Sequence, residues 1–314
     1  MQRNTSLDAI AGLFIIMMMF IHFNILSIQP YSLGSFFVFY MPWFFFKSGM
    51  FYKEQKDIKN NIRKCLCKFA VPYFVFAIFG LSLQFLGLVL TGDPTSKLFY
   101  STIAQYVLNG FAWNNIPLWF LFALFFVRVF SPFICRKRTW ICWVILFLIV
   151  AYWHEETFHE HFTYIGTISL GSFFYILGWR LKNFQFENYI LGIGLLVYAL
   201  LFLFYPSYLN FFSNSMEYGN WFVSVLGSIA GIVMINNLFA RFSCLSSSSI
   251  LTYFGRESMT YLVMHVPIFL LLRHVLTVDS YYINWVCGIV ALFFCFLAET
   301  FLIKKYNLNI LIGK

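Results

Sequence analysis

Residues 7–27 read LDAIAGLFIIMMMFIHFNILS, and this stretch decides the fold class. It is long enough to cross a membrane as a helix, yet it carries two ionisable side chains, Asp8 and His22. A carboxylate or an imidazole in the hydrocarbon region costs several kcal/mol unless it faces a bundle interior or a wet cavity. On a helix the two side chains would lie about 40° apart around the axis and about 21 Å apart along it. One face of this helix must therefore point at something other than lipid.

The composition is that of a polytopic membrane protein. Of the 314 residues, 61% are hydrophobic and only 11% are charged, whereas a soluble protein carries about 25% charged residues. The formal net charge is +9, but the cations fall in short connections between apolar stretches, as the positive-inside rule expects. We therefore expect contact with anionic lipid headgroups and no binding of nucleic acid. Cys65 and Cys67 lack the two-residue spacer of metal and redox motifs, so we expect all seven cysteines to be reduced structural residues.

Apolar stretches of about 17–25 residues predict ten membrane spans. They lie near 7–27, 33–52, 69–91, 115–134, 139–154, 163–181, 187–206, 219–238, 250–276 and 281–303. Residues 97–116 are a candidate interfacial or re-entrant helix before the fourth span. If the N-terminus is cytoplasmic, only Lys97 and Arg273 among the cations of the connections fall outside, where acidic residues gather. We therefore predict an all-α bundle of about ten transmembrane helices with both termini cytoplasmic, forming a single domain over 1–314.

Five local patterns hold the residues best suited to chemistry. In chain order they are Arg3, Asp8, Gly12 and His22; 41–49 with Arg63-Lys64 and 71–73; 117–121; 174–178; and 253–258 with 261–265. In this order and spacing they resemble the acyltransferase-3 family of integral-membrane acyltransferases, whose members O-acetylate surface polysaccharides and other glycans. The resemblance covers almost the entire chain.

The resemblance implies a multi-pass protein of the bacterial cytoplasmic membrane that uses acyl-CoA as donor and binds no permanent cofactor. The acyl group, expected to be acetyl from acetyl-CoA, would pass to a hydroxyl of a cell-surface glycan or a lipid-linked sugar. His22 aligns with the family's essential histidine of the first helix. It would act as a general base on the sugar hydroxyl or as a transient acyl carrier, and both roles need a neutral imidazole. The alternative is a histidine that only hydrogen-bonds between helices.

One position departs from the family pattern. Members usually carry arginine or lysine eleven residues before the histidine, and this chain has Ala11 there. Eleven residues is about three helical turns, so the missing cation would share the face of His22 and hold phosphate or orient a carboxylate. Lys47 is our candidate replacement, because an ammonium within a span needs a partner and Asp8 lies near the same cytoplasmic end. Snorkelling of Lys47 to the membrane interface is the alternative.

Four further residues are candidates for catalysis and substrate contact. Asp8 is a candidate catalytic residue together with His265, which lies in the family's Tyr-x-x-x-His-x-Pro setting. His265 would orient the acceptor or the thioester carbonyl, or else hydrogen-bond between helices. Trp119 and Ser48, both inside the matching patterns, are the candidates for substrate contact.

Three cations are candidates for holding the donor. Arg63 and Lys64 lie in the basic connection after the second span, and Arg128 lies near the cytoplasmic end of the fourth. A guanidinium binds phosphate bidentately, so this set would reach the phosphates of CoA. Snorkelling of Arg128 to lipid phosphate is the alternative.

Residues 154–161 read HEETFHEH and offer three imidazoles and three carboxylates, enough in principle for zinc. The metalloprotease pattern His-Glu-x-x-His is not met, because the second histidine comes one position late. We predict a solvated acidic loop with no metal; glycan contact and a metal site are the alternatives.

Two other functions fit the same buried ionisable groups. A transporter or flippase would use Asp8, Lys47, His22 and His265 as a proton or substrate pathway, although the two halves of the chain show no matching repeat. A catalytically inactive relative of the family is the other, and Ala11 is the argument for it. The oligomeric state and the acceptor sugar are left open by the sequence.

Overall fold

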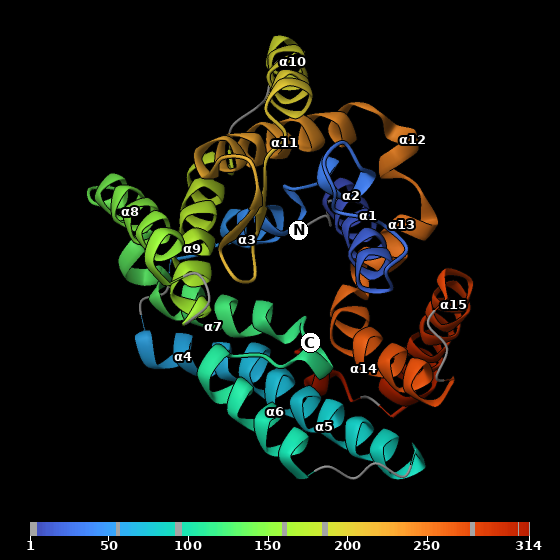
Figure 1. Cartoon of the computed structure of the whole chain (residues 1–314). Helices are drawn as coiled ribbons and strands as arrows, with labels where there is room; N and C mark the ends of the chain where they lie inside the picture. Colours follow the sequence, from blue (N-terminus) through green and yellow to red (C-terminus); the bar gives the residue numbers. More distant parts are fainter. Residues whose placement is uncertain are drawn as a thin grey trace. The chain divides into compact units, whose positions relative to one another are not determined.

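The computed structural model describes residues 5–54, 57–91, 96–158, 162–183, 188–276, 280–306 and 308–313. These residues form helices almost throughout, with one antiparallel hairpin of β1 (Tyr208–Asn210) and β2 (Ser215–Tyr218) (Figure 1). The chain divides into two compact units. The first contains the described residues up to Phe14 and those of Ser27–Ile58 and Phe126–Arg256; the second contains Ile15–Leu26, Lys59–Phe125 and the described residues from Glu257 onward. The prediction of one domain stays a prediction.

Six helical stretches of the described chain are long and apolar enough to cross a membrane. They are α1 (Thr5–His22), Ile58–Leu90, Trp140–Thr157 in α8 (Trp140–Phe158), α11 (Trp221–Arg241), α14 (Ser258–Leu276) and Tyr281–Phe301. The second of these runs through α4 (Ile58–Cys65), the π-helix η1 (Leu66–Ala70) and α5 (Val71–Thr91), and the last through α15 (Tyr281–Leu297) into the π-helix η3 (Ala298–Lys304). The chain is therefore an α-helical membrane protein, and the count of about ten spans and the cytoplasmic termini stay predictions.

The other predicted spans also fall on helices. The apolar helices α7 (Leu118–Ile134) and α10 (Asn188–Phe204) are shorter than the six, and α9 (Thr163–Leu181) has the predicted bounds. The region expected to be interfacial forms α6 (Ser96–Asn109) and the 3-10 helix η2 (Trp113–Asn115). Two further short helices are α12 (Ser243–Ser246) and η4 (Asn309–Ile312).

Two predicted spans are broken, so the expectation of one continuous helix in each is wrong. Residues 33–52 form α2 (Leu33–Phe36) and α3 (Tyr40–Met50). Residues 250–276 form α13 (Ser249–Arg256) and α14, and the Glu257 carbonyl accepts the Thr260 N–H at 3.0 Å. Hydropathy averaged over a membrane-length window does not resolve a one-residue break of this kind.

In the first unit, glycines allow two helix pairs to approach closely. A Cβ on Gly12 of α1 would collide with the Leu251 carbonyl oxygen of α13, and one on Gly255 of α13 with the Asp8 carbonyl oxygen. The pair α3 and α9 meets in the same way, at Gly49 and Gly178. In a membrane the hydrophobic effect does not drive helices together, because lipid tails are as apolar as the side chains. Small residues at the contact instead allow the two backbones to pack closely. Both members of each glycine pair belong to the sequence patterns that stood out.

In the second unit, a buried amide satisfies the backbone at a proline. Pro267 lies inside α14 and has no N–H to donate to the carbonyl of Val263. The Asn115 side chain donates to that carbonyl and to the Phe76 carbonyl, both at 3.1 Å. Asn115 is fully buried, so it fixes η2 between α5 and α14.

The antiparallel pair α14 and α15 is joined at one end by a buried carboxylate. Glu299 of η3 is fully buried and accepts a hydrogen bond from the hydroxyl of Thr260, at the start of α14. Lys304 Nζ lies 3.6 Å from the same carboxylate. These contacts set the end of α15 against the beginning of α14.

α1 ends at His22, earlier than the predicted span 7–27. Asn24 follows with a left-handed φ of 54°, and its N–H donates to the Ile21 carbonyl at 3.0 Å. The Ile25 N–H donates to the Phe20 carbonyl at 2.9 Å. This is a Schellman termination, in which asparagine tolerates the left-handed position better than most residues. It places His22 in the last turn of the helix.

Candidate functional site

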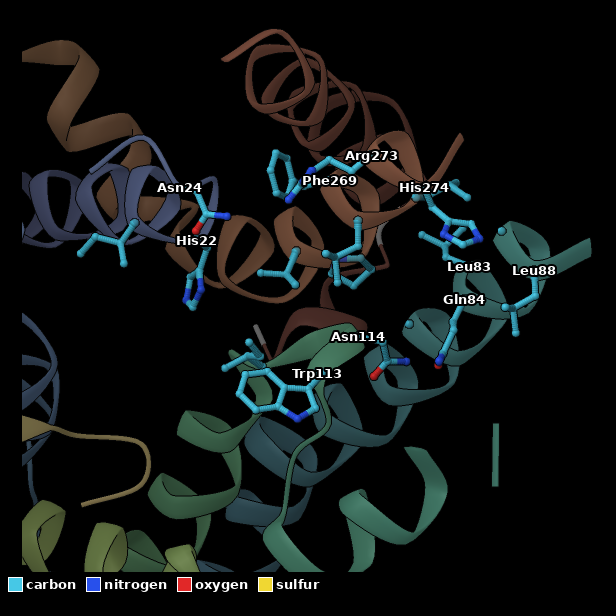
Figure 2. A pocket seen from close by; sticks show the side chains of 18 residues that line it. His22, Asn24, Leu83, Gln84, Leu88, Trp113, Asn114, Phe269, Arg273 and His274 are labelled. Atoms are coloured by element: carbon cyan, nitrogen blue, oxygen red, sulfur yellow. The ribbon is translucent and has the colours of Figure 1, made fainter. Parts of the chain in front are cut away.

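The second unit contains a pocket of about 700 Å³. Its walls are the C-terminal parts of α1, α5 and α14, together with η2 (Figure 2). Most of its lining is apolar, with a few convergent polar side chains, which is the usual make-up of a small-molecule site of this size.

His22 lies at the wall of this pocket and is half-buried. The centroid of its ring is 5.3 Å from that of His265, and the two planes are tilted by 48°. The His22 ring makes no hydrogen bond to any residue that the structure describes. The imidazole is therefore reachable by a ligand, as its predicted role requires.

His265 lies beside His22 but is fully buried. Its Nδ1 is 2.6 Å from the Tyr261 carbonyl oxygen, and because a carbonyl only accepts, Nδ1 must carry the proton of the neutral ring. The lone pair of a neutral His265 is then on Nε2, which has no hydrogen-bond partner among the described residues. The two predicted catalytic histidines thus lie together, one at the pocket and one behind it.

The first unit brings together three charged side chains at the start of α1. Lys47 Nζ is 4.0 Å from Asp8 Oδ1 and donates to the Leu7 carbonyl at 3.1 Å. Arg256 Nε is 3.9 Å from Asp8 Oδ2. The side chain of Asp8 is only 10% exposed, so both cations approach it at the edge of the protein interior. The Lys47–Asp8 pairing expected from the sequence is observed.

Nearly the whole chain matches one protein family. The model of a family described as "Acyltransferase domain", acyltransferase-3, matches residues 4–304. The chain belongs to this family. Comparison with curated proteins and with solved structures finds no match to the chain. Together with its apolar helices, the family makes this protein an integral membrane acyltransferase.

The family's usual cation is replaced by Ala11, whose side chain is buried in the first unit. Leu7, whose carbonyl binds the Lys47 ammonium, lies one helical turn before Ala11 on the same face of α1. Lys47 therefore delivers a positive charge close to the position where relatives carry one. Its ammonium also lies 5.2 Å from the centre of the Trp43 ring.

The other predicted donor-binding residues lie in different places. Arg63 and Lys64 are exposed on α4, in the second unit. Arg128 belongs to the first unit, where its Nη1 donates to the hydroxyl of the buried Tyr175 at 3.0 Å. Contact of these three residues with phosphate stays a prediction.

The two predicted substrate contacts are not among the residues that line the pocket. Trp119 is 7% exposed in α7, and Ser48 is half-buried in α3. The pocket is instead lined by a different tryptophan, Trp113, which lies five residues before the Leu118 that begins α7 and is 61% exposed. Trp113 falls in the segment 97–116, whose interfacial character was the available signal.

Three more pocket residues were missed by sequence reasoning. Gln84, Asn114 and Arg273 each line the pocket, but none lies in the five patterns. Arg273 carried one signal, because it is one of two cations that the predicted topology leaves outside.

The cluster 154–161 is only partly the expected solvated loop. α8 continues to Phe158, and His154 is 1% exposed, so the loop prediction is wrong for this part. Its Nε2 is 3.1 Å from the Phe162 carbonyl oxygen, and its Nδ1 is 3.5 Å from Asn214 Nδ2. Residues 159–161 lie outside the described residues. The described residues contain no group of metal-ligating side chains.

Proposed function

We propose that this protein is an O-acyltransferase that moves acetyl from cytoplasmic acetyl-CoA to a hydroxyl of a cell-surface glycan or its lipid-linked precursor. The observation that carries the proposal is the position of His22, whose ring forms part of the wall of the pocket and lies beside His265. Membership of an acyltransferase family supplies the reaction class.

In the proposed reaction, neutral His22 takes the proton of the acceptor hydroxyl while its oxygen attacks the thioester carbonyl carbon. The carbon–sulfur bond breaks, the leaving CoA sulfur takes the proton from the imidazolium, and His22 returns to its neutral form. A positioned base of this kind contributes about 10²–10⁴-fold in rate.

His265 is a positioning residue in this scheme. Its Nδ1–H is held by the Tyr261 carbonyl, which leaves the Nε2 lone pair of the neutral ring as an acceptor beside His22. An N–H of His22 given to that lone pair directs the other ring nitrogen of His22 toward the pocket. Catalytic hydrogen bonds often tighten only when substrate is bound.

The charged groups at the start of α1 are proposed to help hold the donor. Lys47 and Arg256 supply two cations around one carboxylate, Asp8, which orients them. Arg63, Lys64 and Arg128 are the further candidates for the phosphates of CoA, which charged side chains bind through strong hydrogen bonds.

The proposed topology has about ten spans in a bacterial cytoplasmic membrane, with both termini inside. The pocket supports it, because the C-terminal parts of α1, α5 and α14 line it together. These helices belong to the first, third and ninth predicted spans, which all run outward in this topology. The pocket would then open in the outer half, where a surface glycan is presented.

The experiment is incubation of the purified protein with acetyl-CoA labelled in the acetyl group. Thioester cleavage or transfer of label to a glycan supports the enzyme. Binding of acetyl-CoA without any turnover, under conditions in which glycan is present, contradicts the proposal and favours an inactive relative. Analysis of surface glycan from cells with and without the protein identifies the acetylated hydroxyl.

A further inference from the structure

The polar side chains of the pocket indicate which kind of acceptor it holds, an inference that rests on the proposed function. Trp113 lines this pocket and is 61% exposed. Figure 2 shows its indole on the wall of η2, across the pocket from Phe269 and Arg273 of α14. An indole presents a broad apolar face, which suits the apolar face of a sugar ring.

Two amides beside Trp113 are each half-satisfied. Asn114 is 8% exposed; its Oδ1 accepts from the Tyr106 hydroxyl at 2.9 Å, and its Nδ2 has no partner among the described residues. Gln84 Nε2 donates to Thr102 Oγ1 at 3.2 Å, and Gln84 Oε1 likewise has none within the described chain. Whichever way each amide is turned, one polar atom stays unsatisfied. A sugar hydroxyl both donates and accepts, so it matches either atom.

Arg273 adds a positive charge to the same lining. A guanidinium stays protonated in proteins and pairs with carboxylate or phosphate through two parallel hydrogen bonds. In mostly apolar surroundings such a pair is stronger than in water. His274 follows it, and its ring packs on α5, where a Cβ on Gly87 would lie 3.1 Å from His274 Cδ2.

We propose that the acceptor is an anionic sugar, whose ring lies on Trp113 and whose carboxylate or phosphate pairs with Arg273. Its hydroxyls bond to Asn114 and Gln84, and one of them is presented to His22. Figure 2 draws His22 at one side of the pocket and Gln84 at the other, so both sets of groups face the same pocket.

The test uses three probes with one ring and different groups at carbon 6: glucose, glucuronate and glucose 6-phosphate. Their binding to the full chain in phosphatidylcholine nanodiscs is measured by thermal-shift titration. We expect at least one of the two anions to bind at least tenfold more tightly than glucose, and the stronger one distinguishes a carboxylate from a phosphate acceptor. Glucose binding as tightly as both anions would overturn the proposal.

Variants separate the charge from the stacking surface. Arg273→Gln should bring both anions within about twofold of glucose, whereas Arg273→Lys, which keeps the charge, should retain part of the preference. Trp113→Ala should weaken all three probes alike. Arg241→Gln, an exposed arginine at the end of α11, is the matched control and should change nothing. A preference that survives Arg273→Gln contradicts the proposal.

A phospholipid headgroup offers the same anionic chemistry and is tested directly. If nanodiscs containing phosphatidylglycerol abolish the binding of both anionic sugars, the group on Arg273 is a lipid headgroup and the sugar proposal fails. None of these measurements needs acetyl-CoA. A protein that prefers anionic sugars but never cleaves acetyl-CoA would therefore support this inference while contradicting the proposed function.

Discussion

Helices α1 and α8 look alike in sequence but have different surroundings. Both are apolar, long enough to cross a membrane and end near a histidine. However, 61% of Thr5–His22 in α1 is buried, against 11% of Trp140–Thr157 in α8. His22 of α1 lines a pocket without a hydrogen bond to the described residues, whereas His154 of α8 has both ring nitrogens near polar partners. A histidine at the end of a span is thus available for chemistry when its nitrogens are not already used in the fold.

The strongest test of this contrast is to remove each imidazole in turn. His22→Ala should lower acetyl transfer by about 100-fold or more, because a general base is lost, with little change in thermal stability. His154→Ala should lower the melting temperature, because the Phe162 and Asn214 contacts are lost, while the activity of the folded fraction persists. Labelled acetyl transfer and thermal melts in detergent measure both. Undiminished activity of His22→Ala would remove His22 from the mechanism.

A second test concerns why α1 is buried. Gly255→Ala should destabilise the protein by about 1–3 kcal/mol, because its Cβ meets the Asp8 carbonyl of α1 and the backbones must separate. Gly192→Ala in α10 is the matched control, since no atom lies within 4 Å of that added Cβ. Unfolding titrations in mixed detergent micelles compare the two. Equal stability of both variants would show that close packing of α1 on α13 is dispensable.

The smallest expected effect is at the beginnings of the same two helices. Lys47 pairs with Asp8 of α1, whereas the guanidinium of Arg180 lies 4.7 Å from the Trp140 ring at the start of α8. Lys47→Ala should weaken acetyl-CoA binding by about threefold to tenfold through loss of one charge-assisted contact. Arg180→Ala should leave the dissociation constant unchanged. Equal constants for wild type and Lys47→Ala would limit Lys47 to its structural pairing with Asp8 and remove it from donor binding.

Much of the helical organisation could be predicted because apolar length is a local property. The bounds of α9 agree with the prediction, and Lys47 and Asp8 pair as expected because each is costly alone in a membrane. The break at Glu257 was not predicted, because one non-helical residue between two apolar helices hardly alters the hydropathy averaged over a membrane-length segment. The residues of the candidate site likewise include some that could be predicted and some that could not. His22 stood out as an ionisable group in a span, whereas Asn114 and Trp113 looked like ordinary residues of a candidate interfacial segment.

By itself, the sequence determined that this is an α-helical membrane protein of an acyltransferase family and that His22 must face protein or a cavity. The membrane class and the orientation of His22 follow from the cost of placing polar groups in hydrocarbon, which depends on residue type and spacing along one helix. The family follows from the order and spacing of the sequence patterns and from the match over residues 4–304. Only the tertiary structure decided that the ends of α1, α5 and α14 enclose one pocket and that Trp113, Gln84 and Arg273 line it. Such a pocket depends on which faces of distant helices meet, and that is set by packing contacts such as the Asn115 bridge at Pro267.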